Sequence, residues 1–323
     1  LTPFIRSPTA IKVGPGGKGL PIVKVSDNAG DFIHFSGDGQ RLYWSLGPQL
    51  SSCDVTQAMD SIVKTTTPTN DEEGQEPGQD EVDEQDVKSK AEPLIEDRQI
   101  GFVHPHAKPS AVRALVGGRL VTMGKAGVIE DGVVVIDGNR ITAVGKRGSV
   151  EIPEEAIQMD VSGQVILPGF IDTHAHGAQA TSGITPQQNW IDYARLGFGV
   201  TTIHDPSNDT HSIFAASEMT KAGVIDAPRT FSTGRILYGA AGASKAEIKS
   251  LADAEFHLRR MKAVGAFSVK SYNQPRRDQR QQVLVAARKL GMMVVPEGGS
   301  TFMHNMTMIV DGHTGIEHTL PVQ

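Results

Sequence analysis

Residues 165–177, VILPGFIDTHAHG, decide how this chain of 323 residues is interpreted, because an apolar run here ends in two histidines one residue apart. Along a strand the side chains alternate between the two faces, so His174 and His176 should point the same way. Two imidazoles that converge on one point suit a divalent metal ion such as Zn2+. The same spacing also occurs in ordinary polar loops, but the end of an apolar strand favours a metal site.

Downstream of this stretch, short apolar strands alternate with helical segments, the first of which should begin at Thr185-Pro186. The six strands are VILPGFIDTHAH, VTTIHD, RTFSTG, AFSVKSY, MMVVPE and HTGIEHT. Such alternation is typical of a parallel sheet in an α/β fold. A closed (β/α)8 barrel has eight units, so residues 165–323 are predicted to form the first six units of an incomplete TIM barrel.

Three segments precede the predicted barrel. Residues 111–164 hold short apolar runs separated by turns, which predicts a small β-sandwich. Residues 63–110 contain a long run of acids without bases, a composition that predicts an acidic linker. Within residues 1–62, DFIHFSGDGQRLYWSL predicts a hairpin that turns at Ser36–Gly39 and belongs to a larger sheet lying mostly upstream.

The bulk composition excludes some classes of protein. A formal net charge of −6 leaves no surplus of Lys and Arg for binding nucleic acid. Cys53 is the only cysteine, so neither an internal disulfide nor a thiolate metal cluster can form. No stretch approaches the roughly 18 apolar residues of a membrane span. The chain starts at Leu1 with no signal-peptide pattern, and we expect it to be a fragment of a longer protein.

Lys270 ends the apolar strand AFSVK, where it should lie at the mouth of the barrel. A buried lysine favours its neutral amine, which can capture carbon dioxide and form a carbamate that bridges two metal ions. An ordinary strand-end lysine in a salt bridge is the alternative, and formation of a Schiff base is a third possibility.

The fifth and sixth strands supply further candidate ligands. His318 ends the sixth strand and is predicted to be a metal ligand, whereas Glu317 should face the opposite side and His313 should be structural. Glu297 closes the fifth strand, where it could bind metal directly, support another ligand or bind a substrate amine.

Other polar residues are more ambiguous. His204-Asp205 ends the second strand and could contact substrate or hydrogen-bond a metal ligand, although a structural role is equally compatible with the sequence. His304 and three nearby methionines are predicted to form the packed face of a helix: Met303, Met306 and Met308.

The motifs LPGFIDTHAHG, VKSY and GIEHT, together with the strands before them, resemble the metal-dependent amidohydrolase superfamily, and its prolidase-like and imidazolonepropionase-like branch in particular. The resemblance covers roughly residues 112–323. It implies His174, His176 and His318 as ligands, and Lys270 as a carbamylated bridge. This chain departs from the superfamily pattern at Glu297, where a histidine is expected, and the usual aspartate of strand eight would fall beyond Gln323.

The hairpin FIHFSGDGQRLYWSLG is similar to the last blade of a Tol-type β-propeller, which makes residues 1–62 a partial blade and implies an exported protein. The whole pattern predicts a hydrolase that uses a metal-activated water to cleave a carbon–nitrogen bond, with one or two divalent ions and with Lys270 and His318 in catalysis. Its substrate would be a small molecule or peptide-like, and the oligomeric state is left open. The alternative is a non-catalytic scaffold with an amidohydrolase fold.

Overall fold

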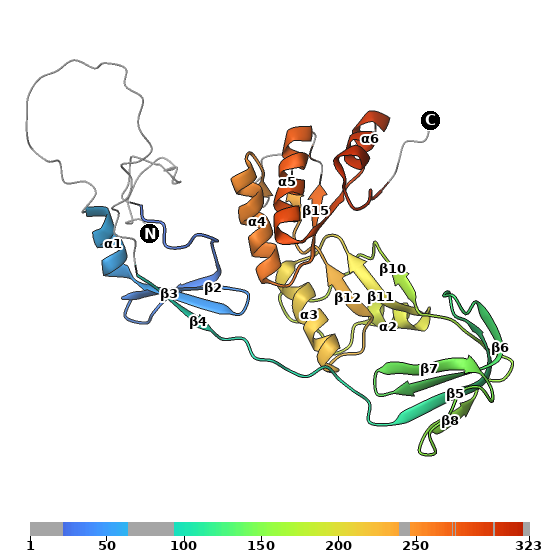
Figure 1. The fold of residues 1–323 in the computed structure, drawn as a ribbon. Coiled ribbons are helices and arrows are strands. Elements are labelled where there is room, and N and C mark those ends of the chain that lie inside the picture. The colour runs from blue at the N-terminus through green and yellow to red at the C-terminus, as the bar shows by residue number, and fades with distance from the viewer. Residues whose placement is uncertain are drawn as a thin grey trace, which may run out of the picture. The chain divides into compact units, whose positions relative to one another are not determined.

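A computed structural model describes residues 22–63, 94–238, 246–272, 274, 276–299 and 301–318. The chain divides after Phe102 into two compact units. Strands and helices are labelled in chain order in Figure 1.

The first unit is a four-stranded antiparallel sheet in which each strand pairs with the next. A short helix lies between the third and fourth strands along the chain. Its elements are β1 (Asp31–Phe35), β2 (Arg41–Leu46), β3 (Gln49–Asp54), α1 (Val55–Val63) and β4 (Ile95–Gln99). The turn at Ser36–Gly39 confirms the predicted hairpin, and Gly39 adopts the left-handed conformation with a φ of 73°. Leu42 and Trp44 pack with Cys53 in a small core.

The sheet of the first unit extends downstream of the hairpin through β3 and β4, and the expected extension upstream stays a prediction. Strand β4 also lies inside the range 63–110 that its composition assigned to a linker, because residues 95–99 pair with β3. The acidic run and residues 1–21 lie outside the described residues. The assignment of this sheet to a propeller blade stays a prediction.

The second unit begins with one mixed sheet of five strands, in the order β7-β6-β5-β8, with β9 also pairing with β5. These strands are β5 (Val112–Val121), β6 (Val128–Asp137), β7 (Arg140–Lys146), β8 (Ile157–Asp160) and β9 (Val165–Ile166). Ala114, Val133 and Val135 are its buried centre. The described residues of 111–164 therefore make a single sheet rather than the two stacked sheets of a sandwich. Val165-Ile166 joins this sheet instead of the first parallel strand.

Parallel strands and helices follow, as the alternating pattern predicted. One sheet has the order β10-β11-β12 and the other β14-β13-β15-β16, and all of their pairings are parallel. The strands are β10 (Phe170–Asp172), β11 (Val200–Asp205), β12 (Arg229–Ser232), β13 (Leu237–Tyr238), β14 (Ala246–Glu247), β15 (Ser268–Tyr272) and β16 (Met293–Pro296).

Among the described residues these strands form two separate ladders, so a closed or continuous barrel remains a prediction rather than an observation. The expected sixth strand, HTGIEHT, is reduced to a single parallel bridge between Glu297 and Glu317. His318, the last described residue of this segment, has a positive φ of 66°, which is outside the range of a regular strand.

The helices are α2 (Trp190–Gly197), α3 (Thr210–Ala222), α4 (Leu251–Ala263), α5 (Arg277–Leu290) and α6 (Phe302–Asp311). Helix α2 begins after Asn189, whose side chain accepts the Ile191 N–H, so the predicted start at Thr185 was wrong. No helix in the described part of the chain is both long and apolar enough to cross a membrane.

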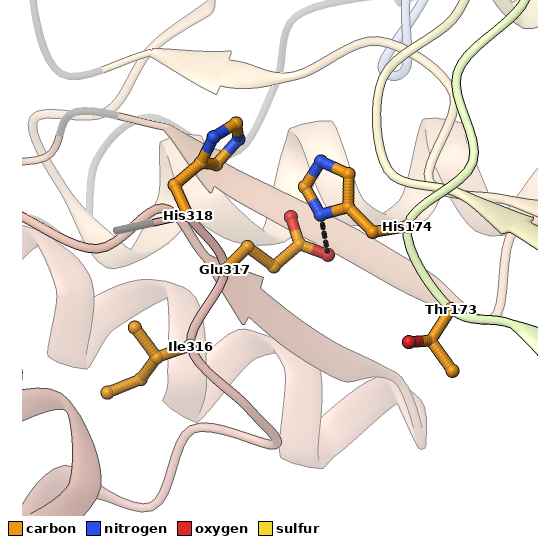
Figure 2. Close-up of a pocket in the computed structure, with 5 residues that line it drawn as sticks. All are labelled: Thr173, His174, Ile316, Glu317 and His318. Atoms are coloured by element: carbon orange, nitrogen blue, oxygen red, sulfur yellow. Dashed lines mark ion pairs between the residues drawn. The ribbon is translucent and has the colours of Figure 1, made fainter. Parts of the chain in front are cut away.

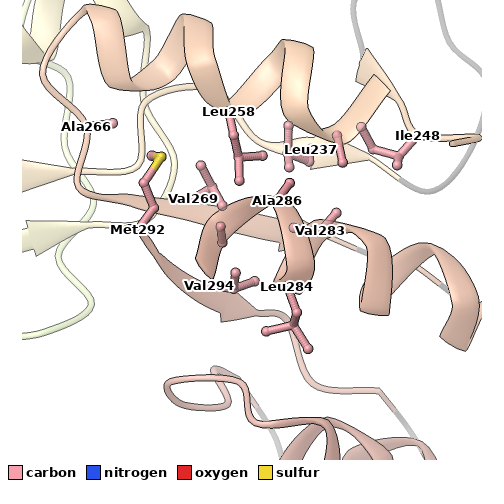
Figure 3. Packing of buried hydrophobic residues seen from close by; sticks show 12 residues of the cluster. Leu237, Ile248, Leu258, Ala266, Val269, Val283, Leu284, Ala286, Met292 and Val294 are labelled. Atoms are coloured by element: carbon pink, nitrogen blue, oxygen red, sulfur yellow. The ribbon is translucent and has the colours of Figure 1, made fainter. Parts of the chain in front are cut away.

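Helices α4 and α5 lie side by side against the β13–β16 sheet, and this layer holds the main core (Figures 1 and 3). Leu258 of α4 and Val283 of α5 meet Val269 of β15 and Val294 of β16, and all four side chains are almost fully buried. Close packing thereby fixes β15 and β16. Lys270 lies in the middle of β15, which continues to Tyr272, rather than at the strand end that the sequence predicted, and Glu297 directly follows β16.

Candidate metal centre

His174 and His176 follow directly after β10. Their Nε2 atoms lie 3.0 Å apart and their ring planes are nearly perpendicular, at 85°. Two nitrogens bound to one tetrahedral zinc at about 2.0–2.1 Å would lie roughly 3.3–3.4 Å apart. The observed separation is close to that value, so the two imidazoles converge. Both residues lie beyond the end of β10, so alternation along a strand is not what brings them together.

Lys270 is the buried cation of the cluster, with 2% of its side chain exposed. Its Nζ lies 3.3 Å from Glu297 Oε2, 3.3 Å from Glu317 Oε2 and 3.3 Å from His318 Nε2. These contacts are those of a lysine in a salt bridge, the alternative to the carbamate and to the Schiff base. A carbamate would require the loss of a proton from this amine.

Glu317 reaches the cluster as well, although the sequence placed it on the opposite face from His318. Its Oε1 lies 3.3 Å from His174 Nδ1 (Figure 2). The alternation rule failed here because it applies to a regular strand, whereas this segment makes one bridge and then turns at His318. The only sequence signal for Glu317 was its place beside His318 after a short apolar run.

A cavity of about 380 Å³ opens beside these groups and is lined by Thr173, His174, Ile316, Glu317 and His318 (Figure 2). The imidazoles of His174 and His318 meet edge to face at its wall, with ring centroids 4.8 Å apart. A reactant of modest size could therefore reach the same groups that could hold an ion.

The groups present fit a divalent cation. Among the described residues, His174, Glu317 and His318 each offer a ligand atom, and these atoms lie within 4.8 Å of one another. That spacing is wider than a closed coordination sphere, so ion binding would draw the three side chains together. The Oε2 atoms of Glu297 and Glu317 are buried and make no hydrogen bond within the described residues, although both lie 3.3 Å from Lys270 Nζ. Lys270 neutralises part of their charge, and each carboxylate keeps further lone pairs that could bind an ion.

Burial lowers the pKa of His174 below its ordinary value. The carboxylate of Glu317 opposes this shift, while the charges of Lys270 and the neighbouring imidazoles add to it. A lowered pKa keeps the ring neutral near pH 7, which is the form that binds a metal ion.

His204 and Asp205, the last two residues of β11, make different contacts. Asp205 Oδ1 lies 3.2 Å from His176 Nδ1, so this carboxylate contacts a candidate ligand. His204 instead hydrogen-bonds Ser268 Oγ at 2.9 Å, and burial lowers its pKa.

The remaining histidines and methionines lie apart from the cluster. His313 Nδ1 is 3.0 Å from the carbonyl oxygen of Met308, which is a structural contact as expected. Met308 is buried in α6, but Met303 is 69% exposed, so the predicted packed methionine face is wrong for that residue. Met303 lies on the exposed side of α6, whereas Asn305 and Met308 are the buried residues of this helix.

Sequence comparison finds short stretches of similarity to curated enzymes, while no family model matches the chain. A 5-methylthioadenosine/S-adenosylhomocysteine deaminase from Symbiobacterium thermophilum is 38% identical over 63 residues, 19% of this chain and 14% of the relative. An imidazolonepropionase from Streptomyces avermitilis is 40% identical over 50 residues, 16% of this chain and 12% of the relative. An adenine deaminase from Sinorhizobium fredii is 40% identical over 100 residues, which are 31% of this chain and 16% of the deaminase. The chain thus spans less than one fifth of these relatives.

Solved structures share the fold over a longer range. A putative prolidase from Bifidobacterium longum matches with a TM-score of 0.54 at 19% identity, over 66% of this chain and 56% of the prolidase. A prolidase complexed with N-methylphosphonate-L-proline matches with a TM-score of 0.53 at 22% identity, over 64% and 61%. The sequence relatives and structural neighbours are amidohydrolase-superfamily hydrolases of carbon–nitrogen bonds. The chain has a mixed α/β fold of that kind.

Proposed function

We propose that this chain contains most of the active site of a metal-dependent hydrolase that cleaves an amide or cyclic amide bond. The observation that carries the proposal is the convergence of His174, Glu317 and His318 beside the buried Lys270, at the carboxyl ends of parallel strands. His176, 3.0 Å from His174, completes the set of nitrogen donors.

A divalent ion such as zinc, held by these residues, would polarise the scissile carbonyl and lower the pKa of a water molecule to about 7. The protein's own contribution is to hold the donors. His174 and His176 present imidazole nitrogens, Glu317 supplies a carboxylate, and Lys270 fixes Glu297 and Glu317 through its two ion pairs. His318 borders the cavity and would contact the reacting group.

The net charge of the cluster links the number of metal ions to the chemical form of Lys270, which can be an ammonium or a carbamate. Asp205, Glu297 and Glu317 carry three negative charges, and an ammonium on Lys270 reduces the net charge to two negatives, which one divalent ion neutralises. If the amine instead attacks carbon dioxide, a nitrogen–carbon bond forms and protons are released. The carbamate then raises the negative charge to four, which two divalent ions neutralise.

The proposed substrate is a small molecule or a peptide-like compound, because the cavity is small and polar on the metal side. The scaffold alternative rests on Glu297 in place of the histidine that the resemblance implies. It predicts a protein that holds no ion.

Metal analysis of the purified protein tests the proposal. We expect at least about one equivalent of zinc in the wild type and less than about one tenth in a double variant of His174→Asn and His176→Asn, because both donors are removed. Turnover of a panel of N-acyl amino acids, Xaa-Pro dipeptides and cyclic amides should disappear together with the metal.

His211→Asn is the matched control, since this histidine lies on an exposed part of α3. Retention of one equivalent of zinc by the double variant would contradict the assignment. A wild type with less than about one tenth of an equivalent would favour the scaffold.

A further inference from the structure

A buried carboxylate contacts the imidazole ring of His176. Asp205 ends β11 with only 1% of its side chain exposed, whereas the imidazole of His176 is 48% exposed. Asp205 Oδ1 lies 3.2 Å from His176 Nδ1. The ring thus contacts a fixed anion on one side and its neighbour His174 on the other.

Asp205 is itself held in place from two directions. Its Oδ1 accepts the Ser207 N–H at 2.9 Å, and its Oδ2 accepts a hydrogen bond from Asn208 Nδ2 at 2.6 Å. Asn208 Nδ2 also donates to the carbonyl oxygen of Gly177 at 2.8 Å. One side chain therefore ties the carboxylate to the peptide that follows His176.

The backbone of His176 has a second support, because Arg195 donates to its carbonyl oxygen at 2.7 Å. The position of the main chain and the direction of the ring are therefore set by different groups. Arg195 and Asn208 fix the main chain, and Asp205 contacts the ring at Nδ1, the nitrogen opposite the one that faces His174.

The contact with Asp205 selects one tautomer of His176. An ionised carboxylate accepts only, so the proton of the neutral ring belongs on Nδ1 and the lone pair on Nε2. Glu317 makes the same selection at His174, since its Oε1 lies 3.3 Å from Nδ1. Both Nε2 lone pairs then face one another across 3.0 Å, which is unfavourable unless a cation or proton lies between them.

We propose that Asp205 is a positioning residue that directs the Nε2 lone pair of His176 toward the metal site. This inference rests on the proposed function and assigns a role that the sequence left open. Removing a carboxylate that supports a metal-binding histidine typically lowers metal affinity by about 10–100-fold.

Zinc affinity and the visible absorption spectrum of the cobalt-substituted protein test the role of Asp205. We expect Asp205→Asn to weaken zinc binding by about 10–100-fold and to change the cobalt spectrum, because the ring loses its charged acceptor. Asp226→Asn is the matched control, since Asp226 is exposed and contacts only the Tyr193 hydroxyl among the bonds described here. A purely structural role would lower the thermal unfolding midpoint but leave zinc affinity and the cobalt spectrum unchanged, and that result would overturn the inference.

A second variant keeps the inference testable if Asp205→Asn does not fold. Asn208→Ala leaves the carboxylate but removes one of its supports, so it should weaken zinc binding by a smaller factor. Unchanged affinity in a folded Asn208→Ala protein would then count against the role. A wild type that binds no zinc contradicts the proposed function itself, whereas zinc bound equally by wild type and Asp205→Asn contradicts only this inference.

Discussion

The two parallel sheets of the second unit are built from the same strand–helix repeat but are buried very differently. In the β13–β16 sheet, Val269 and Val294 are almost completely covered by α4 and α5. In the β10–β12 sheet, Phe170 and Ile171 of β10 are 57% and 66% exposed. The candidate metal centre takes His174 and His176 from the segment after the exposed strand and Lys270 from the buried sheet, while His318 comes from the segment after α6.

The difference shows two ways of fixing a functional side chain. Lys270 and Glu297 are positioned by a close-packed core, where neighbouring side chains leave little freedom. His174 and His176 follow a short exposed strand, so polar contacts rather than packing hold them. The Asp205 carboxylate contacts the ring of His176, and the side chains of Asn208 and Arg195 donate hydrogen bonds to the adjoining main chain. Damage to the core should therefore affect folding, whereas damage to these hydrogen bonds should affect the metal centre.

The largest expected effect comes from Lys270→Met in metal-free protein. This change leaves the carboxylates of Glu297 and Glu317 buried without a cation, which should lower the free energy of unfolding by about 3–5 kcal/mol. Denaturant titration measures it. Lys289→Met is the control: it breaks an exposed ion pair with Glu255 and should cost at most about 1 kcal/mol. Equal losses in the two variants would contradict the burial argument.

A pair of core and surface truncations compares the two sheets directly. Leu258→Ala removes a fully buried side chain and should lower the free energy of unfolding by about 2–5 kcal/mol. Phe170→Ala removes a larger side chain from the exposed strand, and we expect a loss below about 1 kcal/mol. Urea unfolding measures the loss in the free energy of unfolding for each variant. A larger loss for Phe170→Ala than for Leu258→Ala would show that β10 is covered in solution.

Acid should destabilise the second unit of the metal-free protein. Burial lowers the pKa of His204, His257 and His313. The unfolded chain takes up protons near pH 6.5, while the folded chain resists them. Stability is therefore present above about pH 6.5 and is lost as the pH falls through the lowered values in the folded state.

Thermal unfolding of the metal-free protein between pH 7.5 and 5.5 measures this loss. We expect the unfolding midpoint to fall with pH, and His257→Gln should make the decline less steep because one buried imidazole no longer takes part. His211→Gln, on an exposed part of α3, is the comparison variant. A midpoint that rises toward pH 5.5 would reverse the expected sign.

A small effect is also expected at the start of α2, next to the exposed sheet. Asn189→Ala removes the side-chain acceptor for the Ile191 N–H and should cost about 1 kcal/mol. Arg276→Ala at the start of α5 is the contrast, because Arg276 makes no side-chain capping bond. Chemical denaturation of both variants should show the larger loss for Asn189→Ala.

Much of the candidate site could be predicted from the sequence, because its residues follow apolar strands. His174, His176, Lys270, Glu297 and His318 were all placed at strand ends, and the structure brings them into one cluster with contacts of 3.0 to 3.6 Å. Their roles as ligands remain proposals. Glu317 was assigned to the wrong face because a single bridge and a positive φ at His318 replace the expected strand.

The sequence alone determined the alternation of strands and helices and the placement of donor groups at strand ends, since both follow from local patterns of apolar residues. Tertiary structure decided which donors meet: the parallel pairing of β15 with β16 sets Lys270 beside Glu297, and the bridge to Glu317 adds the second carboxylate. It also decided that Asp205 rather than His204 reaches His176. Contacts between residues far apart in the chain depend on how sheets and helices pack, and no local pattern encodes that packing.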